Sequence, residues 1–205
     1  MIKMLIIDYG MCNLNSVRKK FTKIGIQSTI STDPDKIIAA EKLVLPGIGH
    51  FKVAVENLKK SGLWDALNHA VTIKHVPILG ICLGMQLMAK HSEEGGVYGL
   101  GWFDAQVVRF KVNDRIKYKI PHMGWNTAKI MKHSSLLNGV SENQEFYFVH
   151  SYHYQCQEAS EVLTYTDYEY EFCSAVERDN IFGVQFHPEK SHEHGEQILK
   201  NFAAL

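Results

Sequence analysis

The sequence of 205 residues lacks long hydrophobic runs and an excess of charge of either sign. No stretch approaches the roughly 18 consecutive apolar residues of a membrane-spanning helix. The opening MIKMLIIDYG lacks the basic region and the long apolar stretch of a secretory signal. Lysine and arginine total 22, as do aspartate and glutamate, so the charge balance gives no reason to expect a nucleic acid or an anionic membrane as a partner. These absences favour a cytoplasmic protein.

Cysteine is also scarce. The four cysteines, Cys12, Cys82, Cys156 and Cys173, form no CxxC pair and no spacing typical of a metal site. Scattered cysteines of this kind are typical of a reduced cytoplasmic protein, in which one thiol can be reactive while the others are buried. We therefore predict no disulfide framework, no metal site and no cofactor.

Nothing in the sequence divides the chain. It has no repeat, no low-complexity segment and no linker rich in proline, glycine or serine. Apolar residues make up 45% and charged residues 21%, which is the composition of a soluble globular protein. This length suits one well-filled domain and is short for two. The prediction is a single domain over residues 1–205.

Short apolar runs alternate with helical patterns in the first half of the chain. Asn13 or Asn15 can cap a first helix that ends at Gly25, and Asp33-Pro34 can open a second one. The pattern predicts strands at 4–7, 26–31, 43–45 and 76–81, and further helices at 51–60, 64–74 and 83–90. This alternation is typical of an α/β fold with a doubly wound parallel sheet.

The second half contains aromatic and β-branched runs with strand-like alternation. We expect strands at 107–110, 146–154 and 162–165, a hairpin formed by 172–177 and 181–186, and a final helix at 193–204. The predicted fold is therefore a mixed sheet, with a parallel N-terminal half and antiparallel additions in the C-terminal half.

Cys82 is the candidate nucleophile. It lies in Gly80-Ile81-Cys82-Leu83-Gly84, between an apolar strand and a helical pattern, which is the cysteine version of the G-x-S-x-G elbow. The helix that follows favours the thiolate, and the amide N–H of Leu83 is available to an oxyanion. A buried structural cysteine in a glycine turn is the alternative, and the motif alone does not decide between them.

A base and its orienting group are expected in Gln185-Phe186-His187-Pro188-Glu189-Lys190. Residues two apart on an extended segment point to the same side, so His187 and Glu189 can present an imidazole and a carboxylate together. His187 is then the general base and Glu189 holds its tautomer. A metal site is the alternative, because His192, Glu193 and His194 follow closely. The missing HExxH spacing argues against metal, and His192 and His194 are expected at a solvated helix start.

Two further features fit the same pocket. Gly47-Ile48-Gly49 follows the third predicted strand, where crevices of doubly wound sheets form, and its glycines allow the backbone to turn an N–H towards a ligand. Gln86 lies one helical turn after the elbow. Taken alone, an ordinary loop and an exposed glutamine would explain both.

Five motifs carry a resemblance to a known family: LPGIGHF, GICLGMQ, PHMGWN, YFVHSY and FGVQFHPEKS, in this order. GxCxGxQ with FHPE is similar to triad-type (class I) glutamine amidotransferases in general. PHMGWN and the opening DYGM resemble more narrowly the glutaminase subunits of imidazole glycerol phosphate synthases, over essentially the whole chain.

The resemblance implies roles for individual residues. Cys82, His187 and Glu189 match the catalytic triad, and Ile48, Gly49 and Leu83 match the oxyanion region, where the peptide before the second glycine reorients for catalysis. Matching positions around the bound glutamine are Gln86, Glu94, His150, Ser151 and Tyr152. Matching positions that face the synthase partner are Asn13, Trp125 and Lys190.

The resemblance also implies a reaction. Cys82 would attack the carboxamide of L-glutamine and form a glutamyl thioester, which water activated by His187 would hydrolyse to glutamate. The ammonia would pass through a (β/α)₈-barrel cyclase subunit, in a heterodimer, to form imidazole glycerol phosphate and aminoimidazole carboxamide ribotide in histidine biosynthesis. Ammonia is nucleophilic only when neutral, which explains a closed passage between two proteins.

Some stretches depart from this pattern. Cys12 stands where the family usually has glycine, which would be costly if that backbone needs a positive φ. Residues 99–104, 151–154 and 189–192 resemble a branch that supplies ammonia to a sugar amidotransferase in surface-polysaccharide or nonulosonic-acid biosynthesis. A non-catalytic regulatory subunit and an independent cysteine hydrolase are the remaining alternatives.

Overall fold

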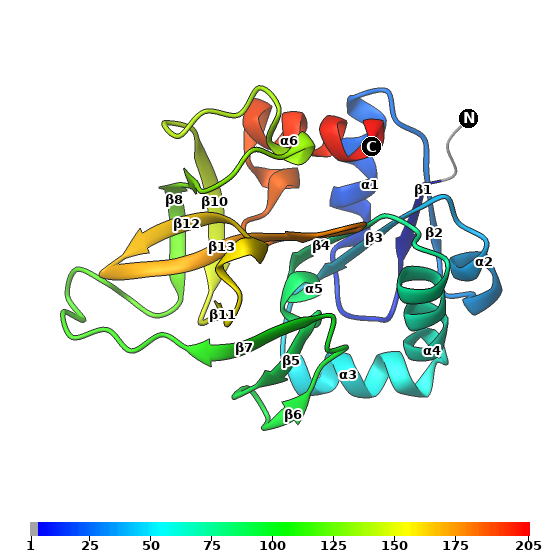
Figure 1. Ribbon diagram of the computed structural model, residues 1–205, viewed down its shortest axis with the longest axis horizontal. Helices are drawn as coiled ribbons and strands as arrows, with labels where there is room; N and C mark the ends of the chain where they lie inside the picture. Colours follow the sequence, from blue (N-terminus) through cyan, green and yellow to red (C-terminus); the bar gives the residue numbers. More distant parts are fainter. Residues whose placement is uncertain (1–3) are drawn as a thin grey trace.

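The first half of the chain builds the parallel part of a large sheet. The computed structural model describes residues 4–205 (Figure 1). Its first strands lie side by side in the order β2 (Ser28–Ser31), β1 (Met4–Ile7), β3 (Lys42–Gly47) and β4 (Ile78–Cys82), and each neighbouring pair is parallel. Strands β1, β3 and β4 are buried throughout, as expected of a parallel sheet covered on both faces. The predicted doubly wound sheet is confirmed.

The helices begin at the capping residues that the sequence indicates. Asn13 caps α1 (Leu14–Lys23), and Gly25 follows that helix with a φ of 80°. Asp33 caps α2 (Pro34–Ile38). The other helices are α3 (Phe51–Lys60), α4 (Leu63–Asn68) with a π-helical turn after it (His69–Ile73), α5 (Leu83–Gln86) and α6 (His192–Ala204). Within residues 4–205, no helix has both the length and the apolar character needed to cross a bilayer.

The second half of the chain extends the sheet with mostly antiparallel strands. Strand β14 (Ile181–Val184) is parallel to β4 and forms the predicted hairpin with β13 (Tyr170–Arg178). The sheet then continues through β11 (Tyr152–Cys156), β7 (Phe103–Arg109), β5 (Ala89–Ser92) and β6 (Val97–Tyr98), while β12 (Val162–Tyr168) and β9 (Lys129–Ile130) branch from β13. A separate two-stranded sheet pairs β8 (His122–Thr127) with β10 (Glu145–His150). The predicted mixture of parallel and antiparallel strands is confirmed.

Two predicted elements differ from the structure in kind, beyond shifts of a few residues at their ends. The helix expected at 83–90 ends at Gln86, and Ala89–Ser92 instead pairs with β7 and β6. Leu87, Met88 and Ala89 are fully buried, so tertiary packing overrides a helical pattern that has no solvent face. The single strand expected at 146–154 is two strands in different sheets, because the chain turns at Ser151.

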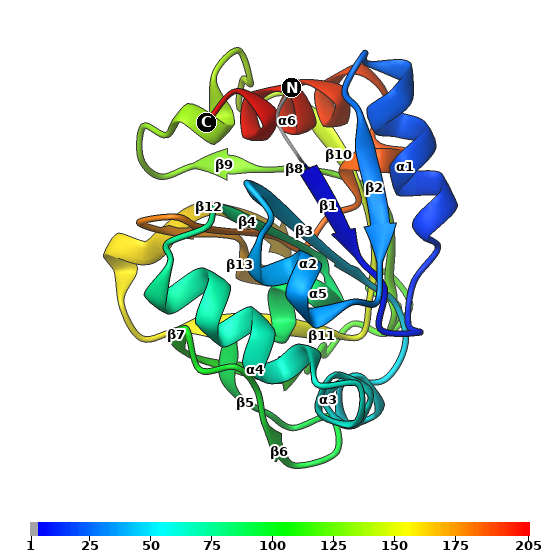
Figure 2. The same ribbon diagram turned by 90° about the vertical axis from the view of Figure 1, so that its right-hand side faces the viewer.

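The core lies on both faces of the sheet. On one face, α1, α6 and the β8–β10 pair bury side chains such as Phe21, Phe148 and Phe202. On the other face, α2, α3 and α4 bury side chains such as Leu58 and Leu67. Figure 2 shows these two layers above and below the edge of the sheet. The sheet is thereby held between two apolar layers, and its strand ends are left to form the site.

Candidate active site

Three neighbouring strands end at the same edge of the sheet and carry the predicted site residues. Gly47, the last residue of β3, is paired with Cys82, the last residue of β4. On the other side of β4, Val184 of β14 is paired with Ile81. The chain leaves β3 towards Ile48 and Gly49, and leaves β14 towards His187. This carboxyl edge is where doubly wound sheets place their ligands.

Cys82 has the backbone conformation of a nucleophile elbow. Its φ is 54° and its ψ is −110°, a strained combination for a residue with a side chain. The flanking glycines permit the sharp turn. A Cβ on Gly84 would overlap the carbonyl oxygen of Leu45, and one on Gly80 would lie 2.7 Å from the amide nitrogen of Met85. The helix that starts at Leu83 can therefore pack directly against the sheet.

His187 and Glu189 form a buried pair. Nδ1 of His187 lies 2.8 Å from Oε1 of Glu189, and the two side chains are only 3% and 6% exposed. The prediction that they share an extended segment is wrong, because Pro188–Lys190 forms a 3₁₀ turn. Ser191 fixes this turn by donating its hydroxyl to the His187 carbonyl at 2.6 Å and accepting the Tyr147 N–H at 2.9 Å.

The charges around His187 favour an imidazolium. Burial lowers its pKa, but the neighbouring Cys82 sulfur and the bonded Glu189 carboxylate outweigh burial and raise the pKa of His187 to about 10. Nε2 of His187 is buried and makes no hydrogen bond of regular geometry with residues 4–205. The contact with Cys82 is thus looser than a full bond, and such catalytic contacts often tighten only when substrate binds. An imidazolium at His187 is therefore the favoured charge state.

Gln185 also touches the candidate nucleophile, although the sequence motifs did not single it out. The side chain is fully buried. Its Nε2 lies 3.6 Å from the sulfur of Cys82, and its Oε1 accepts a hydrogen bond of 3.0 Å from Gln86. The available signal was its place two residues before His187 at the end of a strand, which directs both side chains to one side.

A cavity of about 420 Å³ opens over Cys82. The residues predicted for the oxyanion and glutamine-binding regions share this cavity, which also includes one residue predicted for the partner interface. Its lining comprises Ile48, Gly49, Cys82, Leu83, Gln86, Glu94, Pro121, Val149, His150, Ser151, Tyr152 and Lys190. His187 and Glu189 are not among the lining residues. Of the predicted triad, Cys82 alone borders the cavity.

The polar side chains of the cavity are held by the protein. Gln86 donates through Nε2 to the carbonyl of Tyr152 at 3.0 Å, and His150 bonds the same carbonyl through Nδ1 at 2.7 Å. Glu94 accepts the backbone N–H of Phe51 at 2.8 Å, at the start of α3. These groups are therefore fixed in place around the space in which a small polar substrate could bind.

The loop after β3 contains one bonded peptide N–H and one glycine of positive φ. The N–H of Ile48 is donated to the carbonyl of Met11 at 2.7 Å. Gly49 has a φ of 104°, which glycine tolerates and other residues do not. With the Ile48 N–H already bonded, the next backbone donor of this loop is the N–H of Gly49. Leu83 supplies a second N–H, because the first amides of a helix have no acceptor within it.

Of the three residues predicted to face a partner, Lys190 lines this cavity, whereas Trp125 lines a separate hollow with His192. Trp125 is 43% exposed and stacks on His192 at 4.9 Å between ring centroids. The ammonium group of Lys190 lies 5.4 Å from the ring centroid of Tyr147. Asn13 is exposed and caps α1. The structure thus leaves all three predicted residues accessible from solvent to some degree.

Two predictions concern residues outside the triad: the strain at Cys12 and the alternative of a metal site near His192. Cys12 does not belong to the residues of positive φ among 4–205, so a cysteine is tolerated there without backbone strain. Burial and the Asp8 carboxylate raise the pKa of Cys12 to about 12, which keeps it a thiol. His192 is exposed at the start of α6, and within the described residues no group of three or more potential ligands could hold a metal.

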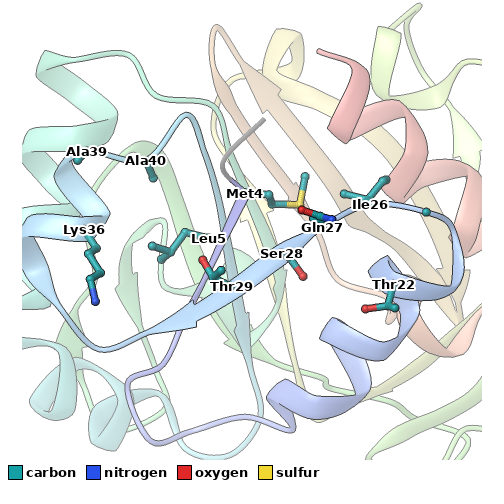
Figure 3. A pocket seen from close by; sticks show the side chains of 11 residues that line it. Met4, Leu5, Thr22, Ile26, Gln27, Ser28, Thr29, Lys36, Ala39 and Ala40 are labelled. Carbon is teal, nitrogen blue, oxygen red and sulfur yellow. The ribbon is translucent and has the colours of Figure 1, made fainter. Parts of the chain in front are cut away.

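A larger cavity of about 860 Å³ lies at the opposite edge of the sheet (Figure 3). It is bounded by the first residues of β1 and β2, among them Met4 and Ser28, and by residues of α1 and α2 such as Thr22 and Lys36. Its lining within residues 4–205 includes no cysteine, histidine or carboxylate. Acid–base and nucleophilic chemistry is therefore assigned to the cavity over Cys82.

Comparison with known proteins agrees with this geometry. The family model for glutamine amidotransferase class-I matches residues 5–205. The chain belongs to the class-I glutamine amidotransferase family. It is an amidotransferase whose fold is shared with a crystal structure of a glutamine amidotransferase, with a TM-score of 0.75 at 15% identity and coverage of 98% of this chain and 97% of that one.

Relatives of this amidotransferase are similar over nearly their full length. A protein of Methanococcus maripaludis, named imidazole glycerol phosphate synthase subunit HisH 2, is 50% identical over 197 residues, which cover 96% of each chain. A protein of Sulfurimonas denitrificans, named imidazole glycerol phosphate synthase subunit HisH, is 48% identical over 203 residues and covers 96% of this chain and 95% of its own.

Proposed function

We propose that this amidotransferase is the glutaminase subunit of an imidazole glycerol phosphate synthase. The observation that carries the proposal is the meeting of Cys82 and the His187–Glu189 pair at the carboxyl edge of the sheet, beside a cavity of about 420 Å³. The two relatives described above are named as subunits of that synthase. The whole of residues 1–205 would act as one amidotransferase domain in the cytoplasm.

The chemistry begins with attack by the Cys82 thiolate on the carboxamide carbon of L-glutamine. The developing oxyanion is bound by the N–H of Leu83 and, after its peptide turns, by the N–H of Gly49. The His187 imidazolium then gives its proton to the leaving amine, and ammonia departs from a glutamyl thioester. Glu189 holds the tautomer and stabilises the positive charge throughout.

Hydrolysis of the thioester uses the same residues, with His187 now acting as the base and Cys82 as the leaving group. Neutral His187 takes a proton from water, whose oxygen attacks the thioester carbon, and the Cys82 thiolate leaves as glutamate forms. Gln86, Glu94 and the turn at Ser151 surround the substrate during both steps. No metal or cofactor is needed for this sequence.

The partner would be a (β/α)₈-barrel cyclase subunit that receives the ammonia in a heterodimer. Lys190, which lines the cavity, and Trp125, which lies on β8, support this interface because both are exposed. Ammonia that crossed bulk water would become protonated and lose its nucleophilicity, so a direct transfer between subunits is favoured. The acceptor would be the ribulosyl phosphoribosyl-formimino intermediate of histidine biosynthesis.

The test is replacement of the nucleophile in the complex with its cyclase. Cys82→Ala should abolish glutamate formation from glutamine, while the ammonia-dependent cyclase reaction with added ammonium salt is retained. Cys12→Ala is the matched control and should keep glutamine hydrolysis. Persistence of glutamine hydrolysis in Cys82→Ala would refute the assignment of the nucleophile.

The identity of the ammonia acceptor is tested by a separate measurement. Supply of ammonia to a sugar amidotransferase uses identical chemistry in this chain, but the names of the relatives favour the histidine pathway. Acceleration of glutamine hydrolysis by the cyclase and its formimino substrate is expected. Acceleration only by a sugar amidotransferase would move the assignment to the other pathway.

A further inference from the structure

We propose that His122 is a positioning residue for the glutamine cavity: its Nδ1–H holds His150 in the one tautomer that fixes the Tyr152 carbonyl beside Gln86. The inference rests on the proposed glutaminase function. His122 itself does not line the cavity over Cys82, so it would act only through His150.

A continuous row of hydrogen bonds connects the two histidines with the cavity. Nδ1 of His150 lies 2.7 Å from the carbonyl oxygen of Tyr152. Nε2 of His150 lies 3.1 Å from Nδ1 of His122, and Nε2 of His122 lies 3.4 Å from the amide nitrogen of Asn126. That amide nitrogen also donates to the carbonyl of Asp167 at 2.8 Å. The row therefore has an acceptor at one end and a donor at the other.

The two ends determine where each proton sits. A carbonyl oxygen can only accept, so Nδ1 of His150 must carry a proton. A neutral His150 then accepts at Nε2, and Nδ1 of His122 must be the donor. Nε2 of His122 is left as the acceptor for the Asn126 amide. Every nitrogen in the row is satisfied in this single arrangement.

The surroundings keep both rings neutral and fixed. His122 and His150 are 3% and 6% exposed. Burial lowers the pKa of His122 to about 4, and burial together with His122 lowers the pKa of His150. The ring of His122 also stacks on Phe148 at 4.9 Å and packs on Tyr168 at 4.0 Å. The rings cannot easily rotate into another pattern of bonds.

The Tyr152 carbonyl connects this row with substrate binding. It accepts from both His150 and Gln86, and the turn from His150 through Ser151 to Tyr152 forms one wall of the cavity. If His122 is lost, Nε2 of His150 has no donor, and the ring gains by rotating or by moving its proton. The turn would then lose one of the two bonds that place it, and glutamine would bind less tightly.

The test compares two substitutions in the complex with the cyclase, one that keeps an aromatic ring and one that keeps an N–H donor. His122→Phe keeps the aromatic packing but removes the donor, whereas the amide of His122→Asn can place an N–H close to the position of Nδ1. We expect His122→Phe to raise the KM for glutamine by roughly tenfold with a much smaller change in kcat. His122→Asn should restore most of the affinity. An unchanged KM in an active His122→Phe enzyme overturns the proposal.

A second measurement separates positioning from general damage to the site. A glutamine-like electrophile must occupy the cavity before it labels Cys82, whereas iodoacetamide needs only the thiolate. His122→Phe should slow labelling by the first reagent and leave the second rate close to that of the wild type. Equal slowing of both rates would assign His122 a structural role only.

The tautomer can be observed directly. Long-range ¹H–¹⁵N correlation spectra of the wild-type chain should show His150 with its proton on Nδ1. A proton on Nε2 would overturn the proposal even if His122→Phe were impaired. Because this readout needs no turnover, it remains decisive if the chain fails to hydrolyse glutamine, an outcome that counts against the proposed function alone.

Discussion

Nε2 of Gln185 lies 3.6 Å from the sulfur of Cys82, in a position that is fully buried. The same side chain accepts a hydrogen bond from Gln86 through Oε1. Its amide therefore cannot reverse its two ends without placing two donors or two acceptors together. A fixed N–H is thus directed at the sulfur, where it stabilises a thiolate more than a thiol.

Loss of this N–H should weaken the nucleophile. In Gln185→Leu, which keeps the volume but not the donor, we expect kcat for glutamine hydrolysis to fall by about tenfold to a hundredfold, since a bond to a charged group contributes about 1.5–3 kcal/mol. The pH dependence of alkylation of Cys82 by iodoacetamide should move to higher pH. Gln185→Asn serves as the comparison with Gln185→Leu, because it keeps an amide on a shorter side chain. An alkylation profile identical to that of the wild type would contradict this role.

The carboxylate of Glu189 should matter more for rate than for binding. In Glu189→Gln the side chain keeps its shape, but His187 loses the charge that helps to raise its pKa. By analogy with the acid of serine-protease triads, kcat should fall by roughly 10³–10⁴-fold while the KM for glutamine changes little. Steady-state kinetics of the complex measures both quantities. An unchanged melting temperature would show that the loss is chemical, and a change confined to KM would argue against the triad.

The sequence predicted the elements that depend on local signals and missed those that depend on distant contacts. The elbow at Cys82 was recognisable because its flanking glycines stand where the sheet and the helix meet. The end of α5 was not, because β5, which starts at Ala89, forms a strand only through pairing with β7, whose residues come later in the chain.

In the site, too, the sequence predicted the features that depend on local signals and missed those that depend on distant contacts. The motif around His187 predicted its pairing with Glu189, but the 3₁₀ turn that brings them together depends on Ser191 and its bond to Tyr147. His122 and His150 are 28 residues apart. Their contact arises from the antiparallel register of β8 and β10, in which they are direct partners. No local spacing could have revealed it.

Buried neutral histidines should make the fold sensitive to acid. Burial lowers the pKa of His122 to about 4, from an ordinary value of 6.5, so between these values the unfolded chain holds one more proton than the folded chain. The contribution of neutral His122 to the free energy of unfolding is fully present above about pH 6.5. It is lost as the pH falls towards 4, at about 1.4 kcal/mol per pH unit. In His122→Asn, the free energy of unfolding should depend less steeply on pH, by the equivalent of about one proton. Urea unfolding measured from about pH 7 to about pH 5 checks this. Parallel curves for the two proteins would contradict the expectation.

The exposed ring of Trp125 should contribute to partner binding. It lies on the β8–β10 sheet, stacked on His192 and close to Tyr147, so it is held rigidly although 43% of it is exposed. Rigid aromatic side chains are the residues that most often dominate interfaces, because little side-chain entropy is lost when they are covered. Trp125→Ala should therefore weaken the affinity for the cyclase by about tenfold to a hundredfold in titration calorimetry. Ile73→Ala removes a side chain that is 67% exposed, just after α4 on the opposite face of the sheet, and should leave the affinity unaltered. Equal effects of the two substitutions would mean that the partner binds elsewhere than beside the cavity over Cys82.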